Sequence, residues 1–212
     1  MPATYDQIQE YHAQLSRHTD PVLLRMEDEA RVERFPIIGP AAGKFCYMMA
    51  RAIGARRIFE LGSGYGYSTL WFARAVRENG GGEVHHTVWD DDLHQRARAN
   101  IAEAGYDDTV RFHLGEAVEA LRGTEGPFDV IFNDIDKDGY PASLPVMKEK
   151  LRVGGLILID NMLWHGAIFD AEDRSPATEG VREFTRRLQE DSDFTFQLVP
   201  VRDGIIAALR TA

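Results

Sequence analysis

The feature that most constrains this chain is a regular alternation of short apolar, strand-like segments with helix-like segments. The expected strands are rich in β-branched and aromatic residues and cover residues 56–61, 83–88, 110–114, 128–134 and 155–160. The expected helices between and after them cover residues 68–78, 92–104, 115–122 and 140–151. Because strand–helix–strand units connect parallel strands with a right-handed crossover, this alternation predicts an α/β fold with a doubly wound, mostly parallel sheet.

The end of the chain departs from this alternation. Two further strand-like runs, residues 194–201 and 204–210, are separated only by Arg202 and Asp203. A connection this short joins antiparallel neighbours, so it predicts a C-terminal antiparallel hairpin. With the five earlier strands, the hairpin completes an expected seven-stranded sheet.

The chain before this α/β part is expected to form N-terminal helices, at residues 5–18, 20–34 and 41–53. Asp20 followed by Pro21 is typical of an N-cap and a first helical residue, and Gly54 is expected to end the third helix.

A length of 212 residues is ample for one α/β domain and short for two. We therefore expect a single domain over residues 1–212, with a helical cap at 1–54 and an α/β core at 55–212.

Composition restricts the partners. The net charge is −10, with 24 Lys+Arg against 34 Asp+Glu, which argues against nucleic acid as the main partner. There is no apolar run of 18 residues and no secretory signal pattern at the start, so we expect no membrane span and a cytoplasmic protein. The single cysteine, Cys46, excludes an intramolecular disulfide, and its apolar neighbours predict a buried structural thiol.

A glycine-rich segment, FELGSGYGYSTL at residues 59–70, follows the first expected strand and opens a helix that Ser68 is expected to cap. Gly62 and Gly64 allow a sharp turn and a close approach to a ligand, although such glycines can also serve only to close a turn. The spacing differs from the dinucleotide fingerprint, and no Walker lysine follows. Glu60, just before the loop, suits the α-amino group of S-adenosylmethionine and would repel a pyrophosphate.

Acidic and amide side chains follow two other expected strands. Asp134 ends one strand, and Asp160 with Asn161 ends the next one. Ligand sites of open α/β sheets lie outside the carboxyl ends of the strands, so we expect these three side chains to meet. Oxygen ligands without His or Cys suit a hard divalent cation, Mg²⁺ or Ca²⁺. The alternative is that Asp134 and Asp160 are only polar strand terminators.

Together these segments resemble the caffeoyl-CoA / catechol O-methyltransferase family, especially its small bacterial members. The resemblance rests on FELGSGYGYSTL, on FDVIFNDIDKDGY at 128–140, on LRVGGLILIDNMLWHGAI at 151–168 and on LVPVRDGIIAALR at 198–210. It implies a class I methyltransferase fold, which is Rossmann-like. It also implies a homodimer and transfer of a methyl group from S-adenosylmethionine to a hydroxyl of a catechol-like or vicinal-diol molecule, assisted by a divalent metal.

The resemblance also implies roles for individual residues. The metal ligands would be Asp134, Asp160 and Asn161. Lys137 would accept the hydroxyl proton, with Asp134 beside it as a catalytic residue that also faces the cofactor. The other expected cofactor contacts are Ile38 with Gly39, Glu60, Gly62, Gly64, Ser68, Glu116 and Ala117.

One position departs from the family pattern. The family carries an acidic residue for the ribose hydroxyls at the end of the second strand, where this chain has Val88. Asp90 is the expected substitute, and Trp89 is a candidate for packing on the adenine.

Several alternatives stay open at this point. Trp164 is expected to wall the acceptor ring, or else to pack in the core, and Lys137 is a base or a surface lysine paired with Asp136 or Asp138. For the whole chain, the alternatives are a protein that binds S-adenosylmethionine with lost or altered catalysis, and a nicotinamide-dependent oxidoreductase.

Overall fold

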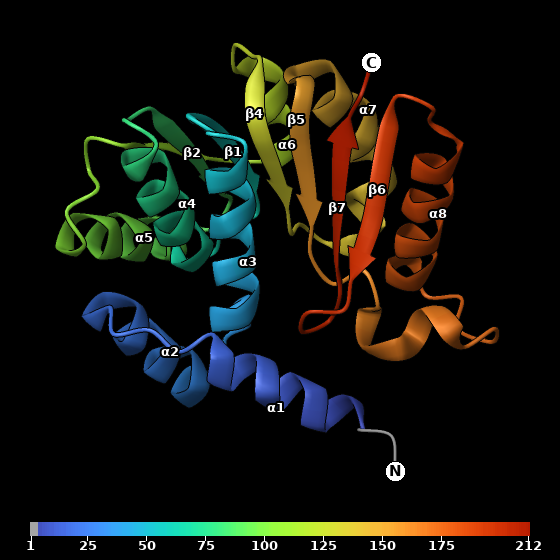
Figure 1. The fold of residues 1–212 in the computed structure, drawn as a ribbon, viewed down its shortest axis with the longest axis horizontal. Helices are drawn as coiled ribbons and strands as arrows, with labels where there is room; N and C mark the ends of the chain where they lie inside the picture. The colour runs from blue at the N-terminus through green and yellow to red at the C-terminus, as the bar shows by residue number, and fades with distance from the viewer. Residues whose placement is uncertain (1–3) are drawn as a thin grey trace.

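The computed structural model describes residues 4–212, and it confirms the predicted α/β fold with a seven-stranded sheet (Figure 1). The strands run in the order β3-β2-β1-β4-β5-β7-β6. Their bounds are β1 Arg57–Leu61, β2 Glu83–Val88, β3 Val110–Leu114, β4 Phe128–Asn133, β5 Leu151–Ile159, β6 Phe194–Val199 and β7 Ile205–Arg210. The α-helices are α1 Tyr5–Leu15, α2 Pro21–Glu33, α3 Gly39–Ala52, α4 Tyr67–Glu78, α5 Asp91–Glu103, α6 Ala117–Gly123, α7 Tyr140–Lys150 and α8 Pro176–Glu190, with 3₁₀ segments η1 Lys137–Gly139 and η2 Trp164–Phe169.

Strands β1 to β5 pair in parallel, and β7 lies antiparallel between β5 and β6. The predicted hairpin is therefore confirmed, but its connection is longer than expected and covers residues 200–204. Strand β1 pairs with β2 on one side and with β4 on the other, so the strand order reverses at this point. Ligand sites of doubly wound sheets lie at such a reversal.

Successive strand residues point to opposite faces of the sheet, so alternate residues enter two separate cores. On β1, Ile58 packs into the core shared with α2, α3 and α4, whereas Phe59 packs into the core shared with α6, α7 and α8. Cys46 is fully buried in the first core, as predicted. The sheet is thus covered from both faces and leaves its strand ends for binding.

Helices α1 and α2 lie across the end of the molecule toward which β4, β5 and β6 point (Figure 1). Helix α2 begins as predicted, with the Asp20 carboxylate accepting hydrogen bonds from the amides of Val22 and Leu23, and with Pro21 in the first turn. Helix α1 buries none of its described residues. Instead, Gln9 holds the β6–β7 loop, donating from Nε2 to the carbonyl of Pro200 at 3.1 Å.

Helix α8 was not among the helices expected from the sequence. Ser175 caps it and Pro176 lies in its first turn, while Val181, Phe184 and Leu188 are buried in the second core. Its Gly180 lies against η1 so closely that a Cβ there would come within 2.1 Å of the carbonyl oxygen of Lys137. Helix α8 therefore supports the segment that carries Lys137.

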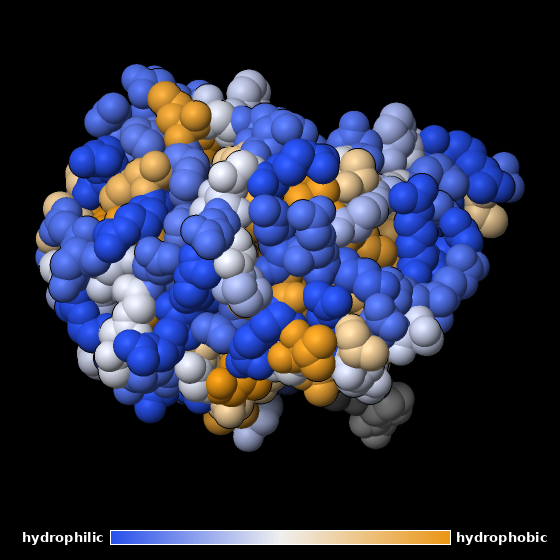
Figure 2. Space-filling view, turned by 90° about the horizontal axis from the view of Figure 1, so that it is seen from above, coloured by the Kyte–Doolittle hydropathy of each residue, from blue (hydrophilic) through white to orange (hydrophobic). Residues whose placement is uncertain are grey.

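The opposite end of the molecule, from which β4 and β5 start, is mainly polar with scattered apolar groups (Figure 2). Among residues 4–212, no helix has both the length and the apolar character needed to cross a membrane.

Candidate active site

A cleft of about 820 Å³ opens at the carboxyl ends of β1, β2 and β4, where the strand order reverses. It is the place where most of the residues expected from the sequence come together. Those that line it are Gly62, Gly64, Val88, Trp89, Glu116, Ala117, Asp134, Lys137, Asn161 and Trp164.

The glycine-rich loop crosses directly over the end of β4. Gly62 has φ +80°, and a Cβ at this position would lie 2.7 Å from the carbonyl oxygen of Asp134. Only glycine fits here, because both the backbone angle and the close approach exclude a side chain. The expectation that Ser68 caps the following helix is wrong: α4 begins at Tyr67, its N-cap is Gly66, and Ser68 is buried in its first turn.

Glu60 lies beneath this loop and is fully buried. Neither carboxylate oxygen has a hydrogen-bond partner among the residues that the structure describes. Burial raises the pKa of Glu60 to about 7, although the nearby hydroxyls of Ser68, Thr69 and Ser63 favour the charged form. These hydroxyls only partly offset the cost of burying an anion, so this position would gain from a cationic group bound beside it.

Two carboxylates meet at the ends of neighbouring strands, as the sequence predicted. Asp134 follows β4 and Asp160 follows β5, which pair in parallel. Burial raises the pKa of both carboxyl groups, and the negative charge of Asp134 raises that of Asp160 further. Asp160 is fully buried, and its Oδ1 has no hydrogen-bond partner in the described chain.

These observations test whether a divalent cation suits the site. Within residues 4–212, no group of three or more His, Cys, Asp and Glu side chains has the arrangement of a metal site. The donor set here is instead two carboxylates with the amide oxygen of Asn161, which is the all-oxygen chemistry of Mg²⁺ or Ca²⁺. The unpartnered Oδ1 of Asp160 and the raised pKa values of both carboxyl groups fit a cation bound between them.

Lys137 is buried in η1 and contacts Asp134. Its Nζ lies 2.7 Å from Asp134 Oδ1 and 3.1 Å from the carbonyl oxygen of Ile135, and it also faces the Trp164 ring at 5.7 Å. The alternative of a surface lysine paired with Asp136 or Asp138 is therefore wrong. The structure holds this ammonium group beside the carboxylate of Asp134, at the wall of the cleft.

Two residues at this end of the cleft were missed in the sequence. Arg202 donates from Nη1 to Asp160 Oδ2 at 2.8 Å. Asp203 accepts from Asn161 Nδ2 at 3.2 Å, which leaves the amide oxygen of Asn161 free for another partner, and it also accepts from the amide of His165 at 2.7 Å. The signal in the sequence that could have identified them is that Arg202 and Asp203 are charged residues in the connection of the predicted hairpin.

The expected ribose contact is not at the cleft wall. The Asp90 carboxylate is the N-cap of α5 and accepts from the amide of Leu93 at 2.8 Å. Val88 and Trp89 line the cleft instead, and the Trp89 side chain is 80% exposed. Four further expected site residues are buried behind the wall rather than lining it: Ile38, Glu60, Ser68 and Asp160.

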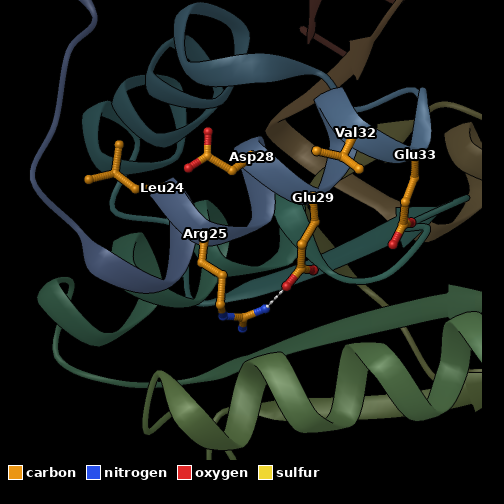
Figure 3. A pocket seen from close by; sticks show the side chains of 6 residues that line it. All are labelled: Leu24, Arg25, Asp28, Glu29, Val32 and Glu33. Atoms are coloured by element: carbon orange, nitrogen blue, oxygen red, sulfur yellow. Dashed lines mark hydrogen bonds and ion pairs between the residues drawn. The ribbon is translucent and has the colours of Figure 1, made fainter.

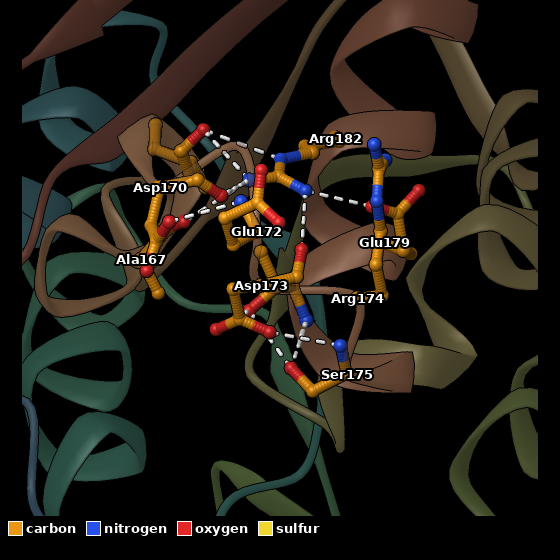
Figure 4. Close-up of polar contacts among 10 residues, drawn as sticks. Ala167, Asp170, Glu172, Asp173, Arg174, Ser175, Glu179 and Arg182 are labelled. Carbon is orange, nitrogen blue, oxygen red and sulfur yellow. Dashed lines mark hydrogen bonds and ion pairs between the residues drawn. The ribbon is translucent and has the colours of Figure 1, made fainter.

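A second hollow, of about 580 Å³, adjoins the cleft and shares His165 and Arg202 with it. Tyr5, Leu163 and Phe169 give it an apolar lining, so a ring-shaped molecule could extend from one into the other. The loop beside it is fastened by Arg182 of α8, which donates to the carbonyls of Ala167 at 3.1 Å and Asp173 at 2.7 Å (Figure 4).

A further hollow lies along α2, away from these residues. It is lined only by side chains of that helix, with an ion pair between Arg25 and Glu29 (Figure 3). None of the residues expected for the site takes part in it, so we assign the chemistry to the cleft.

Comparison with known proteins agrees with this assignment. The family model described as O-methyltransferase matches residues 16–211. A catechol O-methyltransferase of Niastella koreensis is 32% identical over 216 residues, which cover 97% of each chain. Two solved structures overlay closely: the O-methyltransferase TomG of Streptomyces achromogenes in complex with S-adenosylmethionine (TM-score 0.85, 29% identity, 97% and 96% of the two chains) and an O-methyltransferase of Bacillus cereus in complex with S-adenosylhomocysteine (TM-score 0.86, 27% identity, 96% and 97%).

Proposed function

Because this chain belongs to the O-methyltransferase family, we propose that it transfers the methyl group of S-adenosylmethionine to a hydroxyl of a catechol-like or vicinal-diol molecule, with a divalent cation at the strand ends. The observation that carries the finer part of this proposal is the pair formed by the buried Asp160 and the half-buried Asp134, beside Lys137 and Asn161. Two neighbouring carboxylates would be stabilised by a shared cation, and Asp134 lines the cleft in which an acceptor would bind.

The cofactor would occupy the cleft along the glycine-rich loop. Gly62 and Gly64 let its methionine part approach the backbone, while Glu116 and Ala117 line the adenine end. Glu60, beneath the loop, would attract the α-ammonium group. For the ribose and adenine, Trp89 offers an exposed ring at the cleft wall, whereas Asp90 is engaged as a helix cap.

Asp134, Asp160 and Asn161 would hold the cation, and Asp203 orients Asn161 for this role by accepting from its Nδ2. A bound divalent cation lowers the pKa of a coordinated hydroxyl, which for a phenol is about 10. The acceptor oxygen would attack the sulfonium methyl in line, with a C–O bond formed as the C–S bond breaks and S-adenosylhomocysteine released. Lys137 Nζ, which Asp134 holds at 2.7 Å, would take the hydroxyl proton in its neutral amine form.

The acceptor would lie between Trp164 and the neighbouring apolar hollow. That hollow is lined by α1, by the segment around η2 and by the β6–β7 connection, and loops commonly set substrate choice. The catechol acceptor named for the relative from Niastella koreensis is the first to test. We also propose that residues 1–212 act as one domain and as a homodimer, which light scattering of the purified protein would test.

Methyl transfer to a catechol panel is the direct experiment. Asp160→Ala is expected to abolish transfer while S-adenosylhomocysteine still binds in calorimetric titration. Asp108→Ala, at a side chain 81% exposed, is the control and should keep full activity. If Asp160→Ala stays fully active in excess EDTA, the metal mechanism is wrong. Cofactor binding without transfer to any diol would favour a protein with lost catalysis.

A further inference from the structure

Arg202 is fixed at the metal-facing end of the cleft by contacts on both sides of its backbone. Its amide donates to Gln9 Oε1 at 2.8 Å, and its carbonyl oxygen accepts from the hydroxyl of Tyr5. Both partners belong to α1, which lies across the end of the sheet toward which β6 points (Figure 1). Arg202 also has φ +52°, a backbone angle that a residue with a Cβ adopts only when its surroundings impose it. The contacts with α1 therefore fix the backbone from which the Arg202 side chain extends.

The guanidinium group is directed at one residue of the expected metal site. Its Nη1 lies 2.8 Å from Oδ2 of Asp160, whose side chain is fully buried, whereas the Arg202 side chain is 33% exposed. The second carboxylate, Asp134, is paired with Lys137 in the same way at 2.7 Å. Each of the two carboxylates thus already has a cationic side chain of its own.

We propose that Arg202 is a built-in counter-cation that competes with a divalent metal ion for the Asp160 carboxylate, so that this residue weakens and thereby sets the metal affinity of the site. This inference rests on the proposed function, since it assumes that Asp134, Asp160 and Asn161 bind the metal. The guanidinium group on Oδ2 leaves only Oδ1 of Asp160 free for a metal ion, and its charge repels an incoming divalent cation.

The surroundings also leave the Arg202 side chain room to move away from Asp160. Arg202 lines both the cleft and the neighbouring hollow, so its side chain can turn toward the hollow while its backbone stays held by α1. In the absence of metal the ion pair stabilises the buried Asp160 carboxylate, because a buried charge that loses its partner is strongly unfavourable. Arg202 is accordingly a positioning residue for Asp160 and does not itself need to touch the acceptor.

The experiment measures Mn²⁺ binding by electron paramagnetic resonance, with the full chain saturated with S-adenosylhomocysteine. Arg202→Ala is expected to lower the Kd for Mn²⁺ at least tenfold, which is about 1.4 kcal/mol. Alanine leaves the backbone cost of the positive φ unchanged. Arg202→Lys keeps the charge and should stay within threefold of the wild type, and Arg202→Gln, which removes only the charge, should bind as tightly as Arg202→Ala. If Arg202→Ala does not fold, Arg202→Gln carries the test alone.

Arg152→Ala is the matched control. Arg152 is 35% exposed and pairs with the part-buried Asp129 at 2.6 Å, outside the residues that line the cleft. This variant should lose melting temperature without changing the Kd for Mn²⁺. Arg202→Ala should also lose melting temperature in EDTA, but regain it when Mn²⁺ is added.

The outcomes separate the two proposals. Mn²⁺ affinity of Arg202→Ala equal to or weaker than that of the wild type would overturn the role of Arg202 while leaving the metal site in place. Absence of Mn²⁺ binding in the wild type and in every variant would overturn the metal part of the proposed function, and this inference with it.

Discussion

Replacing Gly180 with alanine is expected to disable the site from a distance, although alanine is the better helix former. Gly180 lies inside α8, where the substitution alone would add up to about 1 kcal/mol of helix stability. The new Cβ, however, would lie 2.1 Å from the carbonyl oxygen of Lys137 and 2.9 Å from Cα of Asp138. These are backbone atoms, so no rotamer change relieves the overlap, and α8 and η1 must separate.

Overpacking of this kind costs about 1–3 kcal/mol, which exceeds the gain in helix propensity. A displacement of η1 by about 1 Å would also break the 2.7 Å contact between Lys137 Nζ and Asp134, and a misplacement of that size can cost about 100-fold in rate. Gly123→Ala is the matched control, because Gly123 is also helical and nothing lies within 4 Å of its Cβ position.

Urea unfolding and initial rates of methyl transfer, measured on both variants, test this reasoning. Gly180→Ala should be less stable than Gly123→Ala by about 2 kcal/mol and slower by about 100-fold, with S-adenosylhomocysteine binding retained. If Gly180→Ala is as stable and as active as Gly123→Ala, then the contact between α8 and η1 does not position Lys137.

Three further predictions concern single side chains. Lys137→Met should lower kcat by about 10²–10⁴-fold with little change in S-adenosylhomocysteine affinity by calorimetry, and an unchanged kcat would exclude Lys137 as the base. Arg182→Ala should free the η2 loop and raise KM for the acceptor more than KM for the cofactor, whereas Arg186→Ala, whose pairs with Glu183 and Glu190 are on the same helix, should change neither. Burial raises the pKa of Glu60 from an ordinary 4.5 to about 7. The contribution of this group to the free energy of unfolding is therefore fully present at low pH. It is lost as pH rises from about 4.5 through 7, by at most about 3 kcal/mol. Glu60→Gln should flatten that fall in chemical unfolding of the cofactor-free protein, and a slope equal to that of the wild type would contradict the assignment.

The order of elements could be predicted from local patterns, with one exception. Strand and helix periods, the Asp20 cap and the hairpin are visible in short stretches of sequence, and the structure confirms them. Helix α8 carried comparable signals, a serine cap followed by Pro176 and apolar residues at helical spacing. The prediction from sequence left this segment out, although all of these signals lie within residues 175–188.

The residues at the cleft also divide into those that the sequence predicts correctly and those that it does not. Gly62, Asp134, Asp160 and Asn161 stand at strand ends, where topology alone brings polar groups together, so sequence could place them. The expectation for Ser68 failed because the backbone of the glycine-rich loop enters α4 at Tyr67, one residue earlier, with no side-chain cap.

What the sequence determined by itself is thus the α/β fold, the family and the acidic pair Asp134 and Asp160, since each depends on residues close together in the chain or on strand order. Only the tertiary structure decided which cation faces which carboxylate. Lys137 lies three residues from Asp134 in the chain, and α8 only supports the segment that carries it, whereas Arg202 meets Asp160 because α1 holds the β6–β7 loop from 193 residues away. Contacts between residues so far apart in the sequence depend on how the helices pack, so no local pattern of residues predicts them.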